Sequence, residues 1–291
     1  MVETLFKPGH TACAGCGQAI AARLVVDAAG KNTIIANNTG CLEVFSTKYP
    51  ESSWGVPWIH SLFENCAAVA SGVESALKYL GKKDAVNVIA QAGDGGTADI
   101  GLQALSGMLE RGHDILYVCY DNEAYMNTGI QRSGLTQTTS NTTTTPPGKN
   151  SYGNPRPKKP MPEIAAAHGV PYVATASAGI PMDIQNKVKK ALKIKGPKYL
   201  QIHVPCPLGW RHESNLTLEV AKLAVETGLY PLFEYIDGQL VSRKIAKIKP
   251  VEEYLKLQGR FKHLLKDPKG LKAIQDVADY NIKKYGLKTE E

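Results

Sequence analysis

The sequence predicts an α/β fold in which a mainly parallel sheet carries helices on both faces. Helix-like and strand-like segments alternate between residues 17 and 206, which is typical of βαβ units. Residues 115–120 (ILYVCY) are apolar throughout, as expected for a strand covered on both sides. Two polar motifs stand where strands end, and parallel sheets bind ligands at that edge.

The spacing of apolar residues predicts the individual helices and strands. Residues 18–29 have Ala, Leu and Val at helical spacing, and residues 64–80 read as a buried helix rich in small residues. Strands are expected over residues 33–36, 86–92, 115–120, 172–174 and 199–204. Further helices are expected over residues 99–109, 163–167, 183–192, 251–265 and 270–284.

Composition divides the chain into two parts. Residues 1–231 form the predicted α/β domain, and residues 232–291, which are polar and basic, form a C-terminal extension. A Thr-, Pro- and Gly-rich loop at about 135–162 is long for a compact domain, so it is either functional or partly disordered. The loop directly follows the candidate binding motifs at residues 93–96 and 121–122, which favours a covering or interface loop.

The length, composition and charge of the chain indicate a globular cytoplasmic protein. The 291 residues are 43% apolar and 21% charged, and no run approaches the ~18 apolar residues of a membrane span. The first ten residues lack the basic and apolar regions of a signal peptide. The net charge of +7 fits a solvated basic surface or docking of an acidic partner, and no nucleic-acid motif accompanies it.

Four cysteines stand where the predicted topology can bring them together. Cys13 and Cys16 share one tight turn, Cys41 follows a helix and a strand, and Cys206 follows the last strand between two prolines. Four thiolates suit a [4Fe–4S] cluster. They also suit tetrahedral zinc, and a CxxC pair can be a thiol redox couple.

The other two cysteines are interpreted as core residues. Cys66 lies in the Ala-rich helix and Cys119 in the apolar strand. Free cysteine is often a small buried apolar residue, so packing is the favoured explanation for both.

A second constellation fits a diphosphate and a divalent cation. Gly93-Asp94-Gly95-Gly96 ends one strand, and Asn122 follows the next. Glycines let phosphate approach the backbone, and Mg²⁺ prefers oxygen ligands together with phosphate. The candidate Mg²⁺ ligands are Asp94, Asn122 and the backbone carbonyl of Ala124.

Six stretches together resemble one family. The GDG…DN spacing looks like the thiamine diphosphate motif, and it occurs with CAGCG, TGCLE, WGVPWIH, FEN and PCP. From about residue 9 to 207 the chain resembles the 2-oxoacid:ferredoxin oxidoreductases, and within them the β subunit of the pyruvate branch (pyruvate synthase). The resemblance implies thiamine diphosphate, Mg²⁺ and a [4Fe–4S] cluster as cofactors.

The resemblance also implies roles for individual residues. Gln18 would contact the cofactor, although some members carry Glu there, and Asn127 would face the thiazolium and the substrate carboxyl as a catalytic residue. His60 and Asn65 are weaker candidates, with structural roles as the alternative. The implied cluster ligands are Cys13, Cys16, Cys41 and Cys206, of which Cys41 would also touch the cofactor. The implied cofactor and Mg²⁺ contacts are Gly93, Asp94, Gly95, Gly96, Asn122 and Ala124.

The implied activity is oxidative decarboxylation of pyruvate with coenzyme A to acetyl-CoA and CO₂, with reduction of ferredoxin, or the reverse, in anaerobic metabolism. The chain has no second α/β domain to supply the carboxylate that activates the aminopyrimidine, so we expect activity only with α-, γ- and δ-type subunits. Alternatives are a branched-chain 2-oxo acid, 2-oxoglutarate or oxalate as substrate, a non-redox thiamine enzyme with structural zinc, or an electron-transfer module that binds no thiamine.

Overall fold

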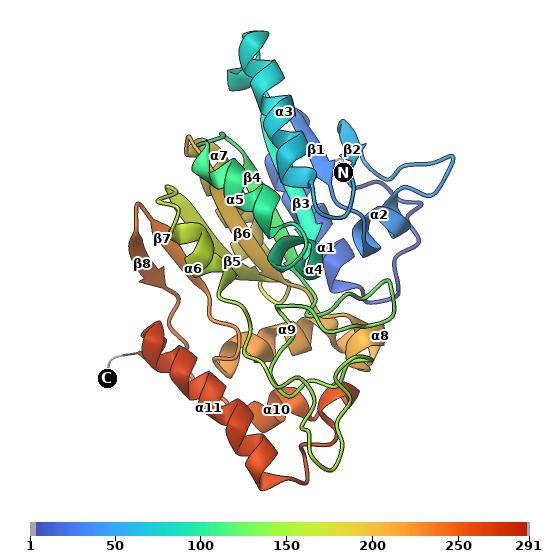
Figure 1. Ribbon diagram of the computed structural model, residues 1–291, viewed down its shortest axis with the longest axis vertical. Coiled ribbons are helices and arrows are strands. Elements are labelled where there is room, and N and C mark those ends of the chain that lie inside the picture. Colours follow the sequence, from blue (N-terminus) through green and yellow to red (C-terminus); the bar gives the residue numbers. More distant parts are fainter. Residues whose placement is uncertain (1–3, 290–291) are drawn as a thin grey trace.

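An eight-stranded sheet forms the centre of the computed structural model, which describes residues 4–289 (Figure 1). The strand order is β2-β1-β3-β4-β6-β5-β7-β8. The first six strands in this order pair in parallel, while β7 and β8 pair antiparallel, which confirms the predicted mainly parallel sheet. The strands are β1 (Thr33–Asn37), β2 (Trp58–His60), β3 (Asn87–Gly93), β4 (Leu116–Asp121), β5 (Tyr172–Ser177), β6 (Lys198–His203), β7 (Phe233–Ile236) and β8 (Gln239–Ser242).

Helices cover both faces of this sheet, as the central strand β4 makes clear. Leu116, Val118 and Tyr120 pack with α1 and α7, whereas Tyr117 and Cys119 point to the opposite face and pack with α3, α5 and α6. This alternation follows from the two-residue period of a strand. The helices in these layers are α1 (Gly17–Ala29), α3 (Cys66–Tyr79), α5 (Leu102–Glu110), α6 (Met161–Ala166) and α7 (Pro181–Lys193).

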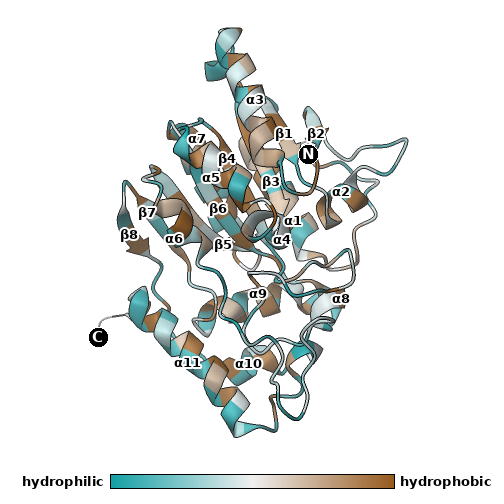
Figure 2. Ribbon diagram, in the orientation of Figure 1, coloured by the Kyte–Doolittle hydropathy of each residue, from teal (hydrophilic) through white to brown (hydrophobic). Residues whose placement is uncertain are grey.

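The remaining helices gather mostly beyond one end of the sheet. They are α2 (Cys41–Ser46), α4 (Asp94–Ala98), α8 (Pro207–Trp210), α9 (Thr217–Glu226), α10 (Val251–Leu255) and α11 (Pro268–Lys284). Apolar residues of α8 to α11 form a separate buried cluster that includes Trp210, Tyr254 and Phe261. Figure 2 shows brown stretches among teal ones along α9, α10 and α11. None of the described helices combines the length and apolar character that crossing a bilayer requires.

The C-terminal part departs from the sequence prediction in two places. Strands β7 and β8 lie within the predicted extension, yet β7 pairs antiparallel with β5 and β8 pairs antiparallel with β7. The start of that segment therefore belongs to the α/β layer. The helix expected over 251–265 ends at Leu255, and a single 3₁₀ turn (Gly259–Phe261) follows it. The division into two domains at residue 231 stays a prediction.

The Thr-rich loop is closely packed against the body of the protein. It has no helix or strand before α6, yet Leu135, Ser140 and Asn154 are buried. The Asn154 amide donates hydrogen bonds of 2.8 Å to the Thr136 carbonyl and 2.9 Å to the Arg156 carbonyl, which fixes the two limbs of the loop to each other. These contacts favour the covering loop over the disordered one.

The carboxyl ends of the parallel strands are level with one another. Gly93 at the end of β3 pairs with Tyr120, and Asp121 at the end of β4 pairs with His203 of β6. The loops that leave β1, β3, β4 and β6 therefore start from one edge of the sheet, where ligand sites of such sheets form.

Candidate cofactor site

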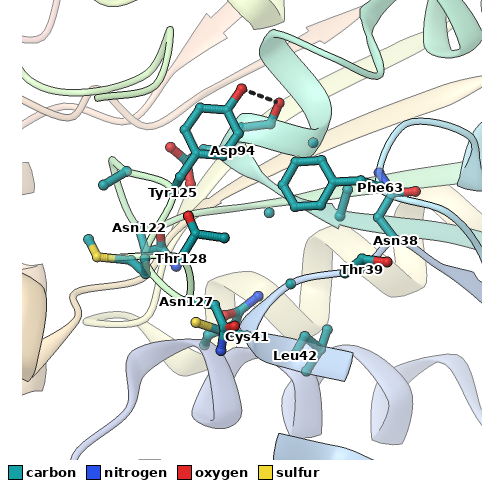
Figure 3. A pocket seen from close by; sticks show the side chains of 18 of the residues that line it. Asn38, Thr39, Cys41, Leu42, Phe63, Asp94, Asn122, Tyr125, Asn127 and Thr128 are labelled. Atoms are coloured by element: carbon teal, nitrogen blue, oxygen red, sulfur yellow. Dashed lines mark hydrogen bonds between the residues drawn. The ribbon is translucent and has the colours of Figure 1, made fainter. Parts of the chain in front are cut away.

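A cavity at this edge collects the residues that follow three strands (Figure 3). The loop after β1 supplies Asn38, Thr39 and Cys41, the end of β3 supplies Asp94, and the loop after β4 supplies Asn127. The full lining is residues 18, 37–42, 63, 92–96, 122 and 124–128. It contains every residue predicted from the sequence to touch thiamine diphosphate or Mg²⁺.

Three polar groups meet at one point of the lining. The end of the Asn122 amide lies 2.8 Å from the carbonyl oxygen of Ala124 and 2.9 Å from Oδ1 of Asp94. Without a cation the amide nitrogen on that side donates both hydrogen bonds. Rotated by half a turn, the amide presents its oxygen instead, and three oxygens then surround the point. Neighbouring ligands of octahedral Mg²⁺, with bonds of about 2.1 Å, lie about 3.0 Å apart, so the 2.8 and 2.9 Å separations here are close to those the ion requires.

Asp94 is held in a setting that opposes its ionisation. Its side chain is buried, and burial together with the nearby carboxyl of Asp121 raises the pKa of Asp94 well above its ordinary value. Oδ2 accepts a hydrogen bond from the hydroxyl of Ser133, which leaves Oδ1 toward the Asn122 amide. A bound divalent cation would offset the burial and favour the carboxylate.

The glycines of the motif serve two different purposes. A Cβ at Gly93 would meet no atom within 4 Å, so the absent side chain leaves open space beside the cavity. A Cβ at Gly95 would overlap the ring of Tyr125, and one at Gly96 would lie 2.9 Å from Asn38 Nδ2. Gly93 therefore leaves room for a ligand, whereas Gly95 and Gly96 let neighbouring side chains close in.

Three buried polar atoms in the lining lack a hydrogen-bond partner. They are Oε1 of Gln18, Oδ1 of Asn37 and Nδ2 of Asn38, each in a side chain no more than 3% exposed. Burying an unpaired amide group is unfavourable, which makes all three atoms candidate contacts for a polar ligand. Asn38 also accepts a 2.8 Å hydrogen bond from the backbone N–H of Cys66, so its orientation is fixed. No motif in the sequence singled out Asn38, although it follows a predicted strand.

A second cavity brings together the four predicted cluster ligands, Cys13, Cys16, Cys41 and Cys206. The CxxC turn precedes α1, and Cys41 begins α2 just after β1. Cys206 precedes α8 and its sulfur accepts a 3.4 Å hydrogen bond from the backbone N–H of Gly209. The cysteines thus come from three loops at the same sheet edge.

The sulfurs are close enough to influence one another's ionisation. Burial raises the pKa of Cys16 to about 11 and that of Cys41 to about 12, and the sulfur of Cys206 adds to both shifts. Burial also raises the pKa of Cys206, with a contribution from Cys13. Iron that binds the thiolates would remove this penalty.

Within residues 4–289, no three His, Cys, Asp or Glu side chains lie close enough together to hold one metal ion as they stand. Four thiolates suit either tetrahedral zinc or an iron–sulfur cluster, and the two differ in size. A [4Fe–4S] cluster is a larger body that binds one thiolate at each of four irons.

The two cavities share one wall. Gln18, Cys41, Asn122 and Asn127 line both. Figure 3 shows Asn127 beside Cys41, below Asn122. The sequence-predicted site residues therefore form two adjoining sites with common walls.

Other cysteine and polar candidates lie elsewhere. Cys66 and Cys119 are fully buried in the core, as predicted. His60 is exposed on β2, where Nε2 lies 2.9 Å from the Thr39 hydroxyl, and Asn65 precedes α3 and accepts a hydrogen bond from Ser61. Neither His60 nor Asn65 lines the two cavities.

The fold and the cofactor cavity define a thiamine-dependent class of protein. Residues 38–202 match the family model of the thiamine pyrophosphate enzyme C-terminal TPP-binding domain. That range holds the loops after β1, β3 and β4.

Curated relatives identify the family more closely. The chain is 59% identical to the pyruvate synthase subunit PorB of Methanosarcina barkeri over 98% of both chains. It is 56% identical to PorB of Methanocaldococcus jannaschii over 98% of this chain and 97% of the relative. The chain therefore belongs to the pyruvate synthase subunit PorB family and is an enzyme subunit with a thiamine-pyrophosphate-binding domain.

Proteins named for other 2-oxo acids are also similar to this chain. The ketoisovalerate oxidoreductase subunit VorB of Pyrococcus abyssi is 50% identical over 91% of this chain and 88% of the relative. A solved 2-oxoglutarate:ferredoxin oxidoreductase from Magnetococcus marinus matches with a TM-score of 0.59 and 24% identity, covering 75% of this chain and 79% of that one. This structural likeness confirms the fold.

Proposed function

We propose that this chain is the thiamine diphosphate- and [4Fe–4S]-binding subunit of a pyruvate:ferredoxin oxidoreductase. The complex would convert pyruvate and coenzyme A to acetyl-CoA and CO₂ while two electrons pass to ferredoxin, or run the reverse reaction. The observation that carries the proposal is the wall shared by the cofactor cavity and the four-cysteine cavity. Full-length similarity to PorB subunits supports the pyruvate branch.

Different residues would hold the Mg²⁺ ion, the diphosphate and the rest of thiamine diphosphate. Asp94, the Asn122 amide and the Ala124 carbonyl would bind Mg²⁺, and the space beside Gly93 would admit the diphosphate. The unpaired amide atoms of Gln18 and Asn38 would contact the rest of thiamine diphosphate. When bound, thiamine diphosphate supplies the carbon centre at which a 2-oxo acid loses CO₂, and the cluster takes up electrons singly.

Asn127 is the residue best placed to act on the substrate. It lines both cavities, and its amide partly offsets the burial that raises the pKa of the Cys41 thiol. An amide N–H at this point could also donate to the carboxylate of a 2-oxo acid and orient it toward the cofactor. Cys41, in turn, would hold the cluster from the same wall.

The site needs a second chain to be complete. Asp94 is the one carboxylate in the described lining of the cofactor cavity, and the Mg²⁺ position occupies it. The acid that activates the aminopyrimidine would therefore come from an α-type subunit, while γ- and δ-type subunits would serve coenzyme A and onward electron transfer. We expect the isolated chain to show no pyruvate-dependent dye reduction; appreciable turnover by this chain alone would contradict the proposal.

The metal assignment is tested with Asn122→Ala in the assembled complex. The variant should lose Mg²⁺-dependent binding of thiamine diphosphate while its iron content stays at the wild-type level. Thiamine diphosphate affinity and bound iron are measured on the same anaerobic preparation. Unchanged affinity would remove Asn122 from the metal site.

A branched-chain 2-oxo acid is the second candidate substrate, because a ketoisovalerate oxidoreductase subunit is 50% identical to this chain. The two candidates share the same cofactor chemistry and differ in the size of the substrate side chain. Anaerobic turnover of the purified complex with pyruvate, 2-oxoisovalerate, 2-oxoglutarate and oxalate would separate them. The highest kcat/KM for pyruvate is the expected result.

A further inference from the structure

The turn that carries two of the proposed Mg²⁺ ligands has an unusual backbone. Glu123 lies between Asn122 and Ala124 and has a φ of 66°, in the left-handed region that residues with a side chain rarely adopt. The reversal brings the Asn122 amide to within 2.8 Å of the Ala124 carbonyl. The position of Glu123 therefore decides whether the two ligands converge.

The carboxylate of Glu123 is anchored on its far side by two cations. Glu123 is 3% exposed, and its Oε2 accepts a 2.6 Å hydrogen bond from Nη1 of Arg260. Its Oε1 accepts a 2.8 Å bond from Nζ of Lys158, which also donates to Asp121 at 2.9 Å. The Thr136 hydroxyl donates a 2.7 Å bond to the Glu123 carbonyl.

Arg260 reaches the turn from the 3₁₀ segment Gly259–Phe261, outside the matched range 38–202. It is 2% exposed and is itself oriented by hydrogen bonds to Gln258 (2.9 Å) and the hydroxyl of Tyr254 (3.0 Å). All of its polar contacts are therefore made inside the protein, and they fix the guanidinium in one orientation.

The same guanidinium contacts the turn by a second route. Its central carbon lies 3.6 Å from the centroid of the Trp210 ring, and Nε1 of Trp210 donates a 2.8 Å hydrogen bond to the carbonyl of Asn122. Arg260 thus supports the residues on both sides of the peptide bond that joins Asn122 to Glu123.

We propose that Arg260 and Glu123 form a positioning pair that holds the Asn122–Ala124 turn in its metal-binding conformation. The inference rests on the proposed Mg²⁺–thiamine diphosphate site and adds the C-terminal segment to it. Groups that orient metal ligands typically change metal affinity by about 10- to 100-fold when they are removed. Loss of Arg260 should therefore weaken Mg²⁺ binding although Arg260 itself touches no ligand.

The test uses the assembled complex, stripped of thiamine diphosphate and Mg²⁺ with a chelator. At a fixed concentration of thiamine diphosphate, Mg²⁺ is added and cofactor binding is followed by quenching of protein fluorescence. In Arg260→Gln the Mg²⁺ concentration for half-saturation should rise about tenfold or more. Arg260→Lys, which keeps the charge, should recover part of this loss, and iron content should match the wild type.

Lys198→Gln is the matched control. Lys198 is also a buried cation paired with a carboxylate, Asp114, but it lies at the opposite, amino-terminal ends of the strands. This variant should lower the melting temperature while the Mg²⁺ half-saturation point stays unchanged. It separates the effect of any broken buried ion pair from an effect on the metal turn.

The outcomes distinguish a failure of the positioning role from a failure of the proposed function. If Arg260→Gln lowers the melting temperature as Lys198→Gln does but leaves the Mg²⁺ half-saturation point unchanged, the pair is structural and the positioning role is wrong. If the wild-type complex binds thiamine diphosphate equally well without a metal, the proposed function itself fails. Should Arg260→Gln not assemble, Glu123→Gln is judged by the same titration, with an unchanged half-saturation point overturning the inference.

Discussion

The Asn127 side chain lies beside the Cys41 thiol at the wall between the cofactor cavity and the four-cysteine cavity (Figure 3). Both residues line both cavities, so a ligand in one cavity and a cluster in the other would have no further layer of protein between them. This contact joins the part of the site that would handle the substrate to the part that would receive electrons.

Replacing Asn127 with Leu should affect turnover more than cofactor content. Removal of one donor aimed at a reacting centre costs on the order of 10²-fold in kcat. We expect a loss of about that size in pyruvate-dependent ferredoxin reduction, with thiamine diphosphate and iron retained. Steady-state kinetics and cofactor analysis on one preparation would check this, and a wild-type kcat would show that Asn127 plays no part in the reaction.

Gly93→Ala should fold normally and bind thiamine diphosphate less well. A methyl group at Gly93 meets no atom within 4 Å and its φ of −73° suits any residue, so the protein accepts it. The methyl group would instead occupy the space assigned to the diphosphate. The control is Gly72→Ala in the interior of α3, also free of contacts, which should gain up to ~1 kcal/mol of stability and leave cofactor affinity unchanged.

Cys206→Ser should lower the iron content of the complex, because a thiolate ligand is lost while the fold stays intact. Cys66→Ala provides the comparison, since Cys66 is fully buried away from the four-cysteine cavity. The comparison variant should lose about 1 kcal/mol of stability and keep its iron. Iron analysis and the visible absorption of anaerobic samples measure the effect; equal iron in both variants would exclude Cys206 as a ligand.

The stability conferred by Asp114 should depend on pH. Burial would raise the pKa of Asp114, but the ammonium groups of Lys198 and Lys83 outweigh it and hold the pKa below its ordinary value. A depressed pKa contributes stability above the unfolded-state value, and this contribution is lost as pH falls through the folded-state value.

Asp114→Asn should therefore cost about 3 kcal/mol at pH 7, since it leaves the buried ammonium of Lys198 without its carboxylate partner. The difference from wild type should shrink as the pH falls below about 4. Urea unfolding at several pH values measures it, and a difference that does not change with pH would count against the ion pair as its source.

The sequence pointed to those candidate site residues whose chemistry is tied to a local pattern. The CxxC turn and the GDG motif each stand beside a strand or helix that apolar spacing predicts, and both line the cavities at the expected edge of the sheet. Asn38 was missed because a single asparagine after a strand has many ordinary uses. The contact between Glu123 and Arg260 joins residues 137 positions apart, and no periodicity reports such a pairing.

The two errors in the predicted secondary structure also have physical causes. Strands β7 and β8 are four residues each and partly exposed, so they lack the apolar runs that revealed β3 and β4. The pattern over 251–265 is helical in spacing, but Gly259 lies against Arg211, and the chain turns there instead of continuing as a helix.

The loop origins of the four cysteines bear on how the protein is made. The CxxC turn is synthesised before Cys206, which follows β6 and is made only after strands β1 to β6. Until β6 pairs with β4 and β5, Cys13, Cys16 and Cys41 lack the fourth cysteine of the cavity. Completion of the proposed cluster would thus follow translation of the sheet, and the nascent polypeptide would need protection from oxidants in the meantime.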